Sequence, residues 1–505
     1  MSAEPVVPDT EDGTPPPDAP PPGAAPRTAD LGGGPRGWSG LRPLVLRLHF
    51  YAGVLVAPFL LVAAVTGLLY AASTQAENIV YDHELRVPVG TSELPLSQQI
   101  AAARKAHPEG EISAIRPSPE AGATTRVLLS GVKGVDPEHK LAVFVNPYTG
   151  EVRGALEQYG TSGALPLRTW IDDLHRNLHL GDTGRLYSEL AASWLWVITG
   201  GGLVLWLARR RTGPAKRKLR ATAFPDRSAT GRRRAMSFHG SVGVWAALGL
   251  FFLSATGLTW STYAGANVTD LRAALGQATP AVSSAVGGEH AGHGSMDGMD
   301  GMEGMEGMDM GGSGGHGGSS ADVGFDAVLE AARAEGLDNP VEIVPPAGPG
   351  TAYTVSQIQR SWPEKQDAAA VDPATGQVTD VVRFEDYPLL AKLSRWGIDA
   401  HMGSLFGLPN QIALAALALA LVFLIVWGYR MWWQRGRAGA FGRPIARGAW
   451  RQVPSYVLAS LVVAIGVLGY YLPLLGIPLA AFLVIDIALG RLADRRGKRA
   501  GAAGA

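Results

Sequence analysis

Two histidines, His49 and His239, each open a long apolar segment and are each followed by a Thr-Gly pair at the same distance. Thr66 lies 66 − 49 = 17 residues after the first histidine, and Thr256 lies 256 − 239 = 17 residues after the second. This internal repeat predicts two related membrane helices, each with an imidazole at its inner mouth. Two imidazoles at matched depth can occupy both axial positions of one haem iron. We therefore expect an inner haem site for transmembrane electron transfer.

A second repeat predicts an outer pair of ligands, His175 and His401. In DLHRNLHLG and AHMGSLFG each histidine is followed six residues later by a glycine, Gly181 or Gly407. His179 is an extra histidine four residues after the first, so on a helix it would share a face with His175. We expect His175 and His401 to hold an outer haem. His179 remains open as an alternative ligand, a hydrogen-bond donor to the ligand, or a proton carrier.

The four histidines and the residues around them can each be interpreted in a structural or a functional way. A single histidine at a helix end is ordinarily an interfacial polar group, but four at repeat-matched positions favour ligands, since intramembrane ionisable residues are usually functional. Gly53 and Gly243, one turn from the inner histidines, would leave room for a flat macrocycle. The Thr-Gly pairs are expected to serve close helix packing rather than ligand contact. Four arginines lie near the two sites: Arg42 and Arg47 on the inner side, Arg176 and Arg185 on the outer side. They could pair with haem propionates, or they could be interfacial side chains that snorkel toward water.

A Met- and His-rich tract occupies 290–316 and carries six methionines spaced by Gly, Asp and Glu. It has no apolar periodicity and is expected to be a flexible segment. Thioether sulfur suits Cu(I), and imidazole takes either copper oxidation state. The tract therefore predicts copper binding, with a low-complexity linker as the alternative. The candidate ligands are His290, His293, Met296, Met299, Met302, Met305, Met308 and Met310.

The composition limits the chemistry that these residues can serve. The chain has 505 residues, 47% of them hydrophobic, with no cysteine and a formal net charge of zero. Without cysteine, iron–sulfur clusters, covalently attached c-type haem and thiol catalysis are excluded. The balanced charge gives no indication of nucleic-acid binding. A redox role would need a non-covalent cofactor such as haem b, in two copies here, or a metal such as copper.

The elements that must position the histidines are six apolar segments that can cross a bilayer. The loops 209–238 and 434–452 and the tail 491–505 are rich in Lys and Arg, which places all three on the cytoplasmic side of the membrane. We therefore predict a multi-pass protein of the cell (cytoplasmic) membrane with both termini in the cytoplasm. The predicted order is a disordered Pro/Gly-rich tail (1–41), span 1 (42–73), an outer domain (74–186), span 2 (187–208), a basic loop (209–238), span 3 (239–263), a second outer domain (264–409), span 4 (410–433), a basic loop (434–452), a hairpin of spans 5 and 6 (453–490) and a cytoplasmic tail (491–505).

The two outer segments repeat one pattern of elements. Each has an amphipathic helix (96–107 or 325–336), then short β-rich strands, then a turn reading VNPYTGEV or VDPATGQV. Alternating apolar residues and Asn/Asp-Pro with Thr-Gly are typical of strands and hairpin turns. The expected fold class is an α-helical polytopic membrane protein of about six spans with two extracytoplasmic α+β domains.

This combination resembles the PepSY-associated transmembrane family. The helix, the strands and the (D/N)P-x-TG-x-(V/I) turn are similar to the PepSY domain, and the histidine-headed spans around two such domains complete the resemblance over about 42–435. The outer family pattern L-H-x-x-L-x-x-G also selects His175, with Leu178 and Gly181. Some members are inner-membrane ferric-siderophore reductases with b-type haem. The resemblance thus implies a metalloreductase whose PepSY domains form the substrate platform.

The sequence contains no dinucleotide fingerprint or P-loop, and its cytoplasmic loops are short. Electrons would therefore come from a cytoplasmic donor or the quinone pool. Our first hypothesis is a di-haem b oxidoreductase that carries electrons across the bilayer to a ferric siderophore or copper outside, in metal uptake. One alternative is a copper-binding, metal-handling protein without electron transfer. Another is a regulatory membrane protein whose PepSY domains bind a peptide or protease.

Overall fold

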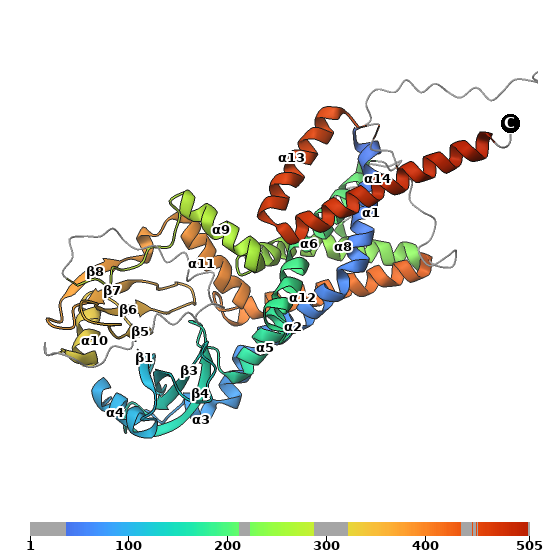
Figure 1. Cartoon of the computed structure of the whole chain (residues 1–505). Coiled ribbons are helices and arrows are strands. Elements are labelled where there is room, and N and C mark those ends of the chain that lie inside the picture. Colours follow the sequence, from blue (N-terminus) through green and yellow to red (C-terminus); the bar gives the residue numbers. More distant parts are fainter. Residues whose placement is uncertain are drawn as a thin grey trace, which may run out of the picture.

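The computed structural model describes residues 37–211, 223–286, 322–435, 447, 451 and 453–502. A bundle of long helices makes up one part, and an antiparallel sheet lies at one end of it (Figure 1). The last helix, α14 (Pro473–Ala502), ends at the far end of the bundle from the sheet. The sheet domain and the C-terminal end of α14 therefore lie at opposite ends of the molecule.

One continuous sheet of eight strands contains both outer segments, in the order β4-β3-β2-β1-β5-β6-β7-β8. The first half is β1 (Glu111–Arg116), β2 (Thr125–Ser130), β3 (His139–Val145) and β4 (Val152–Tyr159); the second is β5 (Val341–Val344), β6 (Tyr353–Gln357), β7 (Ala368–Val371) and β8 (Val378–Val382). The halves join where β1 pairs antiparallel with β5, at Ile115 and Ile343. The two outer segments that were predicted as α+β domains therefore form two matched halves of one sheet. Pairing β1 with β5 covers two edges that would otherwise expose their backbone groups.

The predicted helices and turns of both halves are present. α4 (Leu96–Ala106) and α10 (Gly324–Ala334) pack on the same face of the sheet and share one apolar core with its strands. The Asp326 carboxylate of α10 accepts from the backbone N–H of Leu96, 2.6 Å away, so one half caps the helix of the other. In the turns, Asn146 and Asp372 accept from the N–H two residues on, at 2.9 and 2.8 Å. The two halves therefore use the same turn chemistry.

Five helices of the described chain are long and apolar enough to cross a membrane. They are α2 (Ala57–Val80), α6 (Gly181–Arg211), α8 (Gly231–Leu258), α12 (Leu408–Arg435) and α14. The predicted fifth span corresponds to α13 (Ser455–Tyr471), an apolar helix of 17 residues, which is short of the ~20 residues that a perpendicular span needs. Five of the six predicted spans thus have the length and hydropathy of a membrane helix.

The predicted first span is two helices rather than one. α1 (Gly37–Leu55) ends just before Val56, and α2 begins just after it with Pro58 in its first turn. Because proline has no backbone N–H, the carbonyl of Val54 loses its usual partner four residues on. That carbonyl instead accepts a hydrogen bond of 2.9 Å from the Tyr429 hydroxyl of α12. The bend is thus stabilised by a neighbouring helix.

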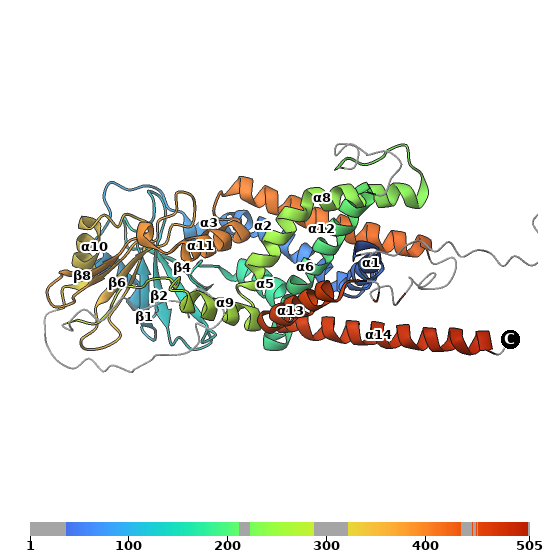
Figure 2. The ribbon, with the colours of Figure 1, turned by 90° about the horizontal axis from the view of Figure 1, so that it is seen from above.

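Three shorter helices lie between the sheet and the long helices. They are α5 (Pro166–Arg176), α9 (Thr262–Ala274) and α11 (Leu389–Met402), and Figure 2 shows α9 and α11 at the junction of the two parts. α3 (Asp82–Leu85) and a short 3₁₀ turn (Phe384–Asp386) complete the described elements. α5 and α11 hold equivalent places in the two halves, directly before a membrane helix, and they carry the outer histidines.

Candidate functional site

The inner histidines lie together between α1 and α8. The ring centroids of His49 and His239 are 6.5 Å apart, and the ring planes are at 78°. His49 Nδ1 lies 2.9 Å from the backbone carbonyl of Ile198 on α6. A carbonyl can only accept, so Nδ1 carries the proton and Nε2 keeps its lone pair. The corresponding Nδ1 of His239 is buried against the Leu424 backbone and makes no well-formed hydrogen bond.

Two glycines other than Gly53 and Gly243 lie directly beside the inner imidazoles. A Cβ at Gly202 would lie 3.0 Å from Cε1 of His49, and one at Gly428 would lie 3.9 Å from Cε1 of His239. By contrast, a Cβ at Gly53 would meet nothing within 4 Å, and one at Gly243 would meet a leucine side chain. The close approach to the imidazoles thus comes from α6 and α12, because these helices pack against the ones that carry the histidines.

The outer histidines are each held by a threonine hydroxyl. Nδ1 of His175 lies 2.8 Å from Oγ1 of Thr66, and Nδ1 of His401 lies 2.6 Å from Oγ1 of Thr256. Each hydroxyl donates its own hydrogen to a carbonyl one turn back on its helix, so it accepts from the imidazole. Both histidines therefore carry the proton on Nδ1 and leave Nε2 unprotonated.

The Thr-Gly pairs thus contact the outer histidines, which the expectation of helix packing did not include. A Cβ at Gly67 would lie 3.3 Å from Cε1 of His175, and one at Gly257 would lie 3.7 Å from Cε1 of His401. The signal in the sequence was that Thr66 and Thr256 recur at the same distance, 17 residues, after the inner histidines. The contact with the outer histidines could not be inferred from this repeat, because His175 lies 109 residues after Thr66 and His401 lies 145 residues after Thr256.

Both outer imidazoles line one cavity that extends from the sheet side into the bundle. Its inner part is apolar and its outer part is polar, with Tyr159, Ser162, Asp172, Arg176, Arg185, Ser188, Trp260 and Ser261 on the wall. Burial lowers the pKa of His175 to about 4. Burial, and then the nearby His175, lower the pKa of His401 to about 3. Both imidazoles are therefore neutral at physiological pH, as a metal ligand must be.

The candidate propionate partners have different surroundings. Arg176 and Arg185 line the outer cavity; the first donates to the Tyr159 hydroxyl at 2.7 Å, and the second to the Trp260 carbonyl at 3.3 Å. The indole N–H of Trp260 is buried in this wall and has no partner within the described chain. On the inner side, Arg47 is buried and forms a 2.7 Å ion pair with Asp486 of α14. Neither interpretation of Arg47 from the sequence included this ion pair.

Arg42, the other inner arginine that the sequence indicated, is exposed. Arg447 adds a second contact to the same Asp486 carboxylate, at 3.3 Å. Arg47 and Arg447 thus tie α14 to the bundle. Arg176 and Arg185 line the outer cavity, and Arg176 also forms a 3.1 Å ion pair with Asp173.

His179 does not share a helix face with His175, so that prediction is wrong. α5 ends at Arg176, and Leu178 and His179 have positive φ angles of 57° and 54°. The His179 ring packs on Trp170, with 5.1 Å between centroids, and the residue is exposed. Of the two histidines, only His175 lines the cavity.

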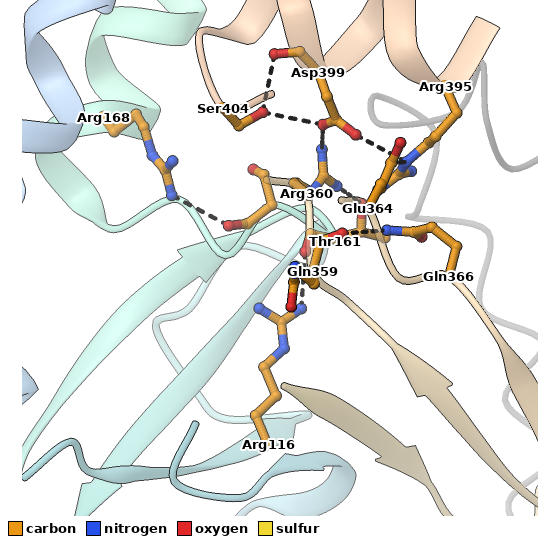
Figure 3. Close-up of polar contacts among 11 residues, drawn as sticks. Arg116, Thr161, Arg168, Gln359, Arg360, Glu364, Gln366, Arg395, Asp399 and Ser404 are labelled. Atoms are coloured by element: carbon orange, nitrogen blue, oxygen red, sulfur yellow. Dashed lines mark hydrogen bonds and ion pairs between the residues drawn. The ribbon is translucent and has the colours of Figure 1, made fainter. Parts of the chain in front are cut away.

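A buried polar cluster fixes α11, and with it His401, to the sheet (Figure 3). Asp399 is fully buried and binds Arg360 at 3.3 Å and Arg395 at 3.1 Å. Arg395 also pairs with Glu364 at 2.9 Å. Burial and the neighbouring Asp399 raise the pKa of Glu364 to about 8. These contacts therefore tie the loop after β6 to the helix that carries His401.

Both pairs offer imidazoles that can bind a metal, and the separation of the inner pair suits a metal held between its two rings. Imidazole nitrogen binds such a metal at about 2 Å, and the ring centre lies about 1 Å behind the nitrogen, so trans imidazoles have centroids about 6 Å apart. The inner separation of 6.5 Å agrees with this value. At the outer pair, neutral imidazoles with free Nε2 and adjacent glycines face a cavity with basic groups at its mouth. The residues present thus fit b-type haem at both positions.

The predicted copper ligands of the 290–316 tract lie outside the described residues. Within the described ranges, no group of three or more His, Asp or Glu side chains is arranged to hold a metal ion. The copper prediction therefore stays a prediction from sequence.

Comparison with known proteins agrees with the repeated architecture. No curated protein matches the chain significantly. The family described as the PepSY-associated TM region matches residues 46–435, which include all four paired histidines. The chain therefore belongs to the PepSY-associated transmembrane family.

Proposed function

We propose that this protein is a transmembrane electron conduit with two b-type haems, which reduces an oxidised metal on the side of the sheet. The observation that carries the proposal is the presence of two repeat-related histidine pairs, one near each end of the bundle. In three of the four histidines a hydrogen bond to Nδ1 leaves Nε2 available as a ligand. A merely interfacial histidine would not need this orientation.

Bis-imidazole haem would supply one-electron transfer without an exchangeable axial position. The protein's own residues would hold and orient it. His49 and His239 would bind one iron, and His175 and His401 the other. Thr66 and Thr256 would fix the outer rings, while Arg176, Arg185 and the Trp260 N–H would bind propionate oxygens at the outer mouth. Two sites in series divide an apolar barrier of about 30 Å into shorter steps.

The substrate would be a ferric siderophore or copper, which takes one electron per ion. The outer cavity opens beside the sheet, so the sheet would support a bulky complex near the outer site. The Met- and His-rich tract belongs to the same side of the predicted topology and favours copper as the metal. If the tract binds copper and no haem is present, metal handling without electron transfer becomes the better account.

The test is a reduced-minus-oxidised absorption spectrum of the detergent-solubilised protein, with haem quantified per chain after expression with adequate haem supply. We expect sharp low-spin b-type bands and about two haems per chain, from two pairs of axial ligands. His49→Ala and His175→Ala should each remove one equivalent, and His179→Ala is the matched control that should retain both. A colourless protein, or one whose haem content is unchanged by both ligand variants, would refute the proposal.

A further inference from the structure

A groove lies between α8 and α12 on the outside of the bundle, separate from the cavity of the outer histidines. We call it the α8–α12 groove. It has a volume of about 650 Å³, within the ~300–1,000 Å³ typical of small-molecule sites. Its wall is almost entirely apolar, with three aromatic side chains: Phe224, Phe238 and Trp245. Trp245 is 67% exposed on the outside of the bundle, so the groove opens toward the bilayer.

The one hydroxyl of the groove wall, Ser241, is without a partner. The residue is 4% exposed, and its Oγ is buried and makes no hydrogen bond within the described chain. A serine in a membrane helix ordinarily donates to the carbonyl one turn back, as Ser460 of α13 does at 2.9 Å. Leaving a buried hydroxyl unpaired costs about 1–3 kcal/mol. Because Ser241 lines the groove, a rotation about its Cα–Cβ bond would present this hydroxyl to an occupant that carries a hydrogen-bonding group.

The groove lies beside the inner histidine pair. Phe238 and Ser241 flank His239 on α8, and two residues of helix rise only about 3 Å. On the opposite wall, Leu417 and Ala420 of α12 line the groove. Further along the same helix, Gly428 approaches the His239 imidazole. A molecule in the groove would therefore sit next to the proposed point of electron entry.

We propose that the α8–α12 groove binds the head ring of a lipid-soluble quinol, which is the electron donor to the inner histidine pair. The proposal rests on the proposed function for the donor role. The donor must enter from the bilayer because the groove opens there. A flat aromatic ring suits the Phe224, Phe238 and Trp245 side chains, and a quinol oxygen would satisfy Ser241. An isoprenoid tail would remain in the lipid.

The reaction balances with the acceptor already proposed. Oxidation of one quinol to the quinone breaks two O–H bonds and releases two protons and two electrons. The electrons pass singly to the inner site, and two ferric or cupric ions outside are each reduced by one electron. Phe224 and Pro225 of the groove wall belong to the loop on the predicted cytoplasmic side, and the two protons would leave to water on that side.

The experiment uses the full chain in phosphatidylcholine nanodiscs, with haem content and reduction by dithionite measured first. Decylubiquinol and a short-chain menaquinol are the electron donors, and haem reduction is followed by stopped flow. A photoreactive azidoquinone measures binding independently of haem. The variants are Ser241→Ala and Trp245→Leu. The controls are Ser460→Ala in α13 and Trp433→Leu near the end of α12, two exposed residues outside the groove.

We expect a quinol to reduce the haem and the azidoquinone to label the peptide 238–246. Ser241→Ala should slow reduction at limiting quinol about five- to tenfold, as for the loss of one hydrogen bond, and both controls should match wild type. Labelling of haem-free protein at 238–246 would support the groove while the proposed function fails. Haem that dithionite reduces but quinol does not, or labelling unaffected by both groove variants, would overturn the inference and leave the proposed function intact.

Discussion

Replacing the two threonines that hold the outer histidines tests whether these hydrogen bonds orient ligands. Thr66→Val and Thr256→Val remove the hydroxyl and keep nearly the same shape, so the packing of α2 and α8 is largely retained. Each change leaves the Nδ1–H of His175 or His401 without the acceptor it has at 2.8 or 2.6 Å. The imidazole can then rotate or move its proton to the ligating nitrogen.

The expected size of the effect follows from those contacts. A buried donor without its acceptor costs about 1–3 kcal/mol. At about 1.4 kcal/mol per tenfold, this corresponds to roughly a fivefold to hundredfold weaker outer site, similar to the 10- to 100-fold typical of residues that orient metal ligands. Loss of the hydrogen bond also makes the imidazole a less basic ligand. The midpoint potential of the outer haem should therefore rise.

The assay is haem titration of the apo-protein together with a redox titration of the reconstituted one. Thr66→Ser keeps a hydroxyl and should restore both affinity and potential, whereas Thr74→Val, eight residues further along α2, is a matched control. The inner haem should be unaffected in every variant. If Thr66→Val and Thr256→Val bind two haems at wild-type affinity and potential, the threonines are packing residues and the orientation argument fails.

Three further outcomes are expected elsewhere in the chain. Asp486→Ala should destabilise the bundle by about 3–5 kcal/mol because it leaves the buried Arg47 charge uncompensated; thermal melting in detergent measures this, and Arg47→Met should recover much of the loss. The pKa of Glu364 is raised from 4.5 to about 8 by burial and Asp399, so its contribution to stability is full below about pH 4.5 and is lost as the pH rises through about 8. Glu364→Gln should flatten the stability profile in that range, and an unchanged profile would contradict the assignment. Deletion of 290–316 should lower Cu(I) affinity in a chelator competition while the haem spectrum stays the same, and undiminished copper binding would make the tract a linker.

Local patterns in the sequence were sufficient for most of the elements. Runs of about 20 apolar residues form membrane helices largely independently of their neighbours. α6, α8 and α12 overlap the predicted spans, although α8 begins and ends several residues earlier than predicted. The amphipathic helices and the Asn/Asp-Pro turns of the outer segments also depend on short-range chemistry. α4 and α10 accordingly begin and end within two residues of their predicted bounds.

Contacts between distant segments could not be predicted in the same way. Nothing in either outer segment alone specifies that Ile115 will pair with Ile343 and merge two units into one sheet. The helix face shared by His175 and His179 was inferred from spacing, but α5 ends before the second histidine. The glycines beside the inner imidazoles come from partner helices. In each case the deciding neighbour is supplied by tertiary packing rather than by the local sequence.

The two halves of the chain contribute to the candidate sites in a regular way. Each half orients its own outer histidine, since Thr66 holds His175 and Thr256 holds His401. The pairs, however, form between halves: His49 meets His239, and the two outer imidazoles line one cavity. The β1–β5 junction joins the same halves within the sheet. A single half would thus contain imidazoles without the histidines that lie opposite them, so the proposed ligation at either site would depend on the two halves packing together.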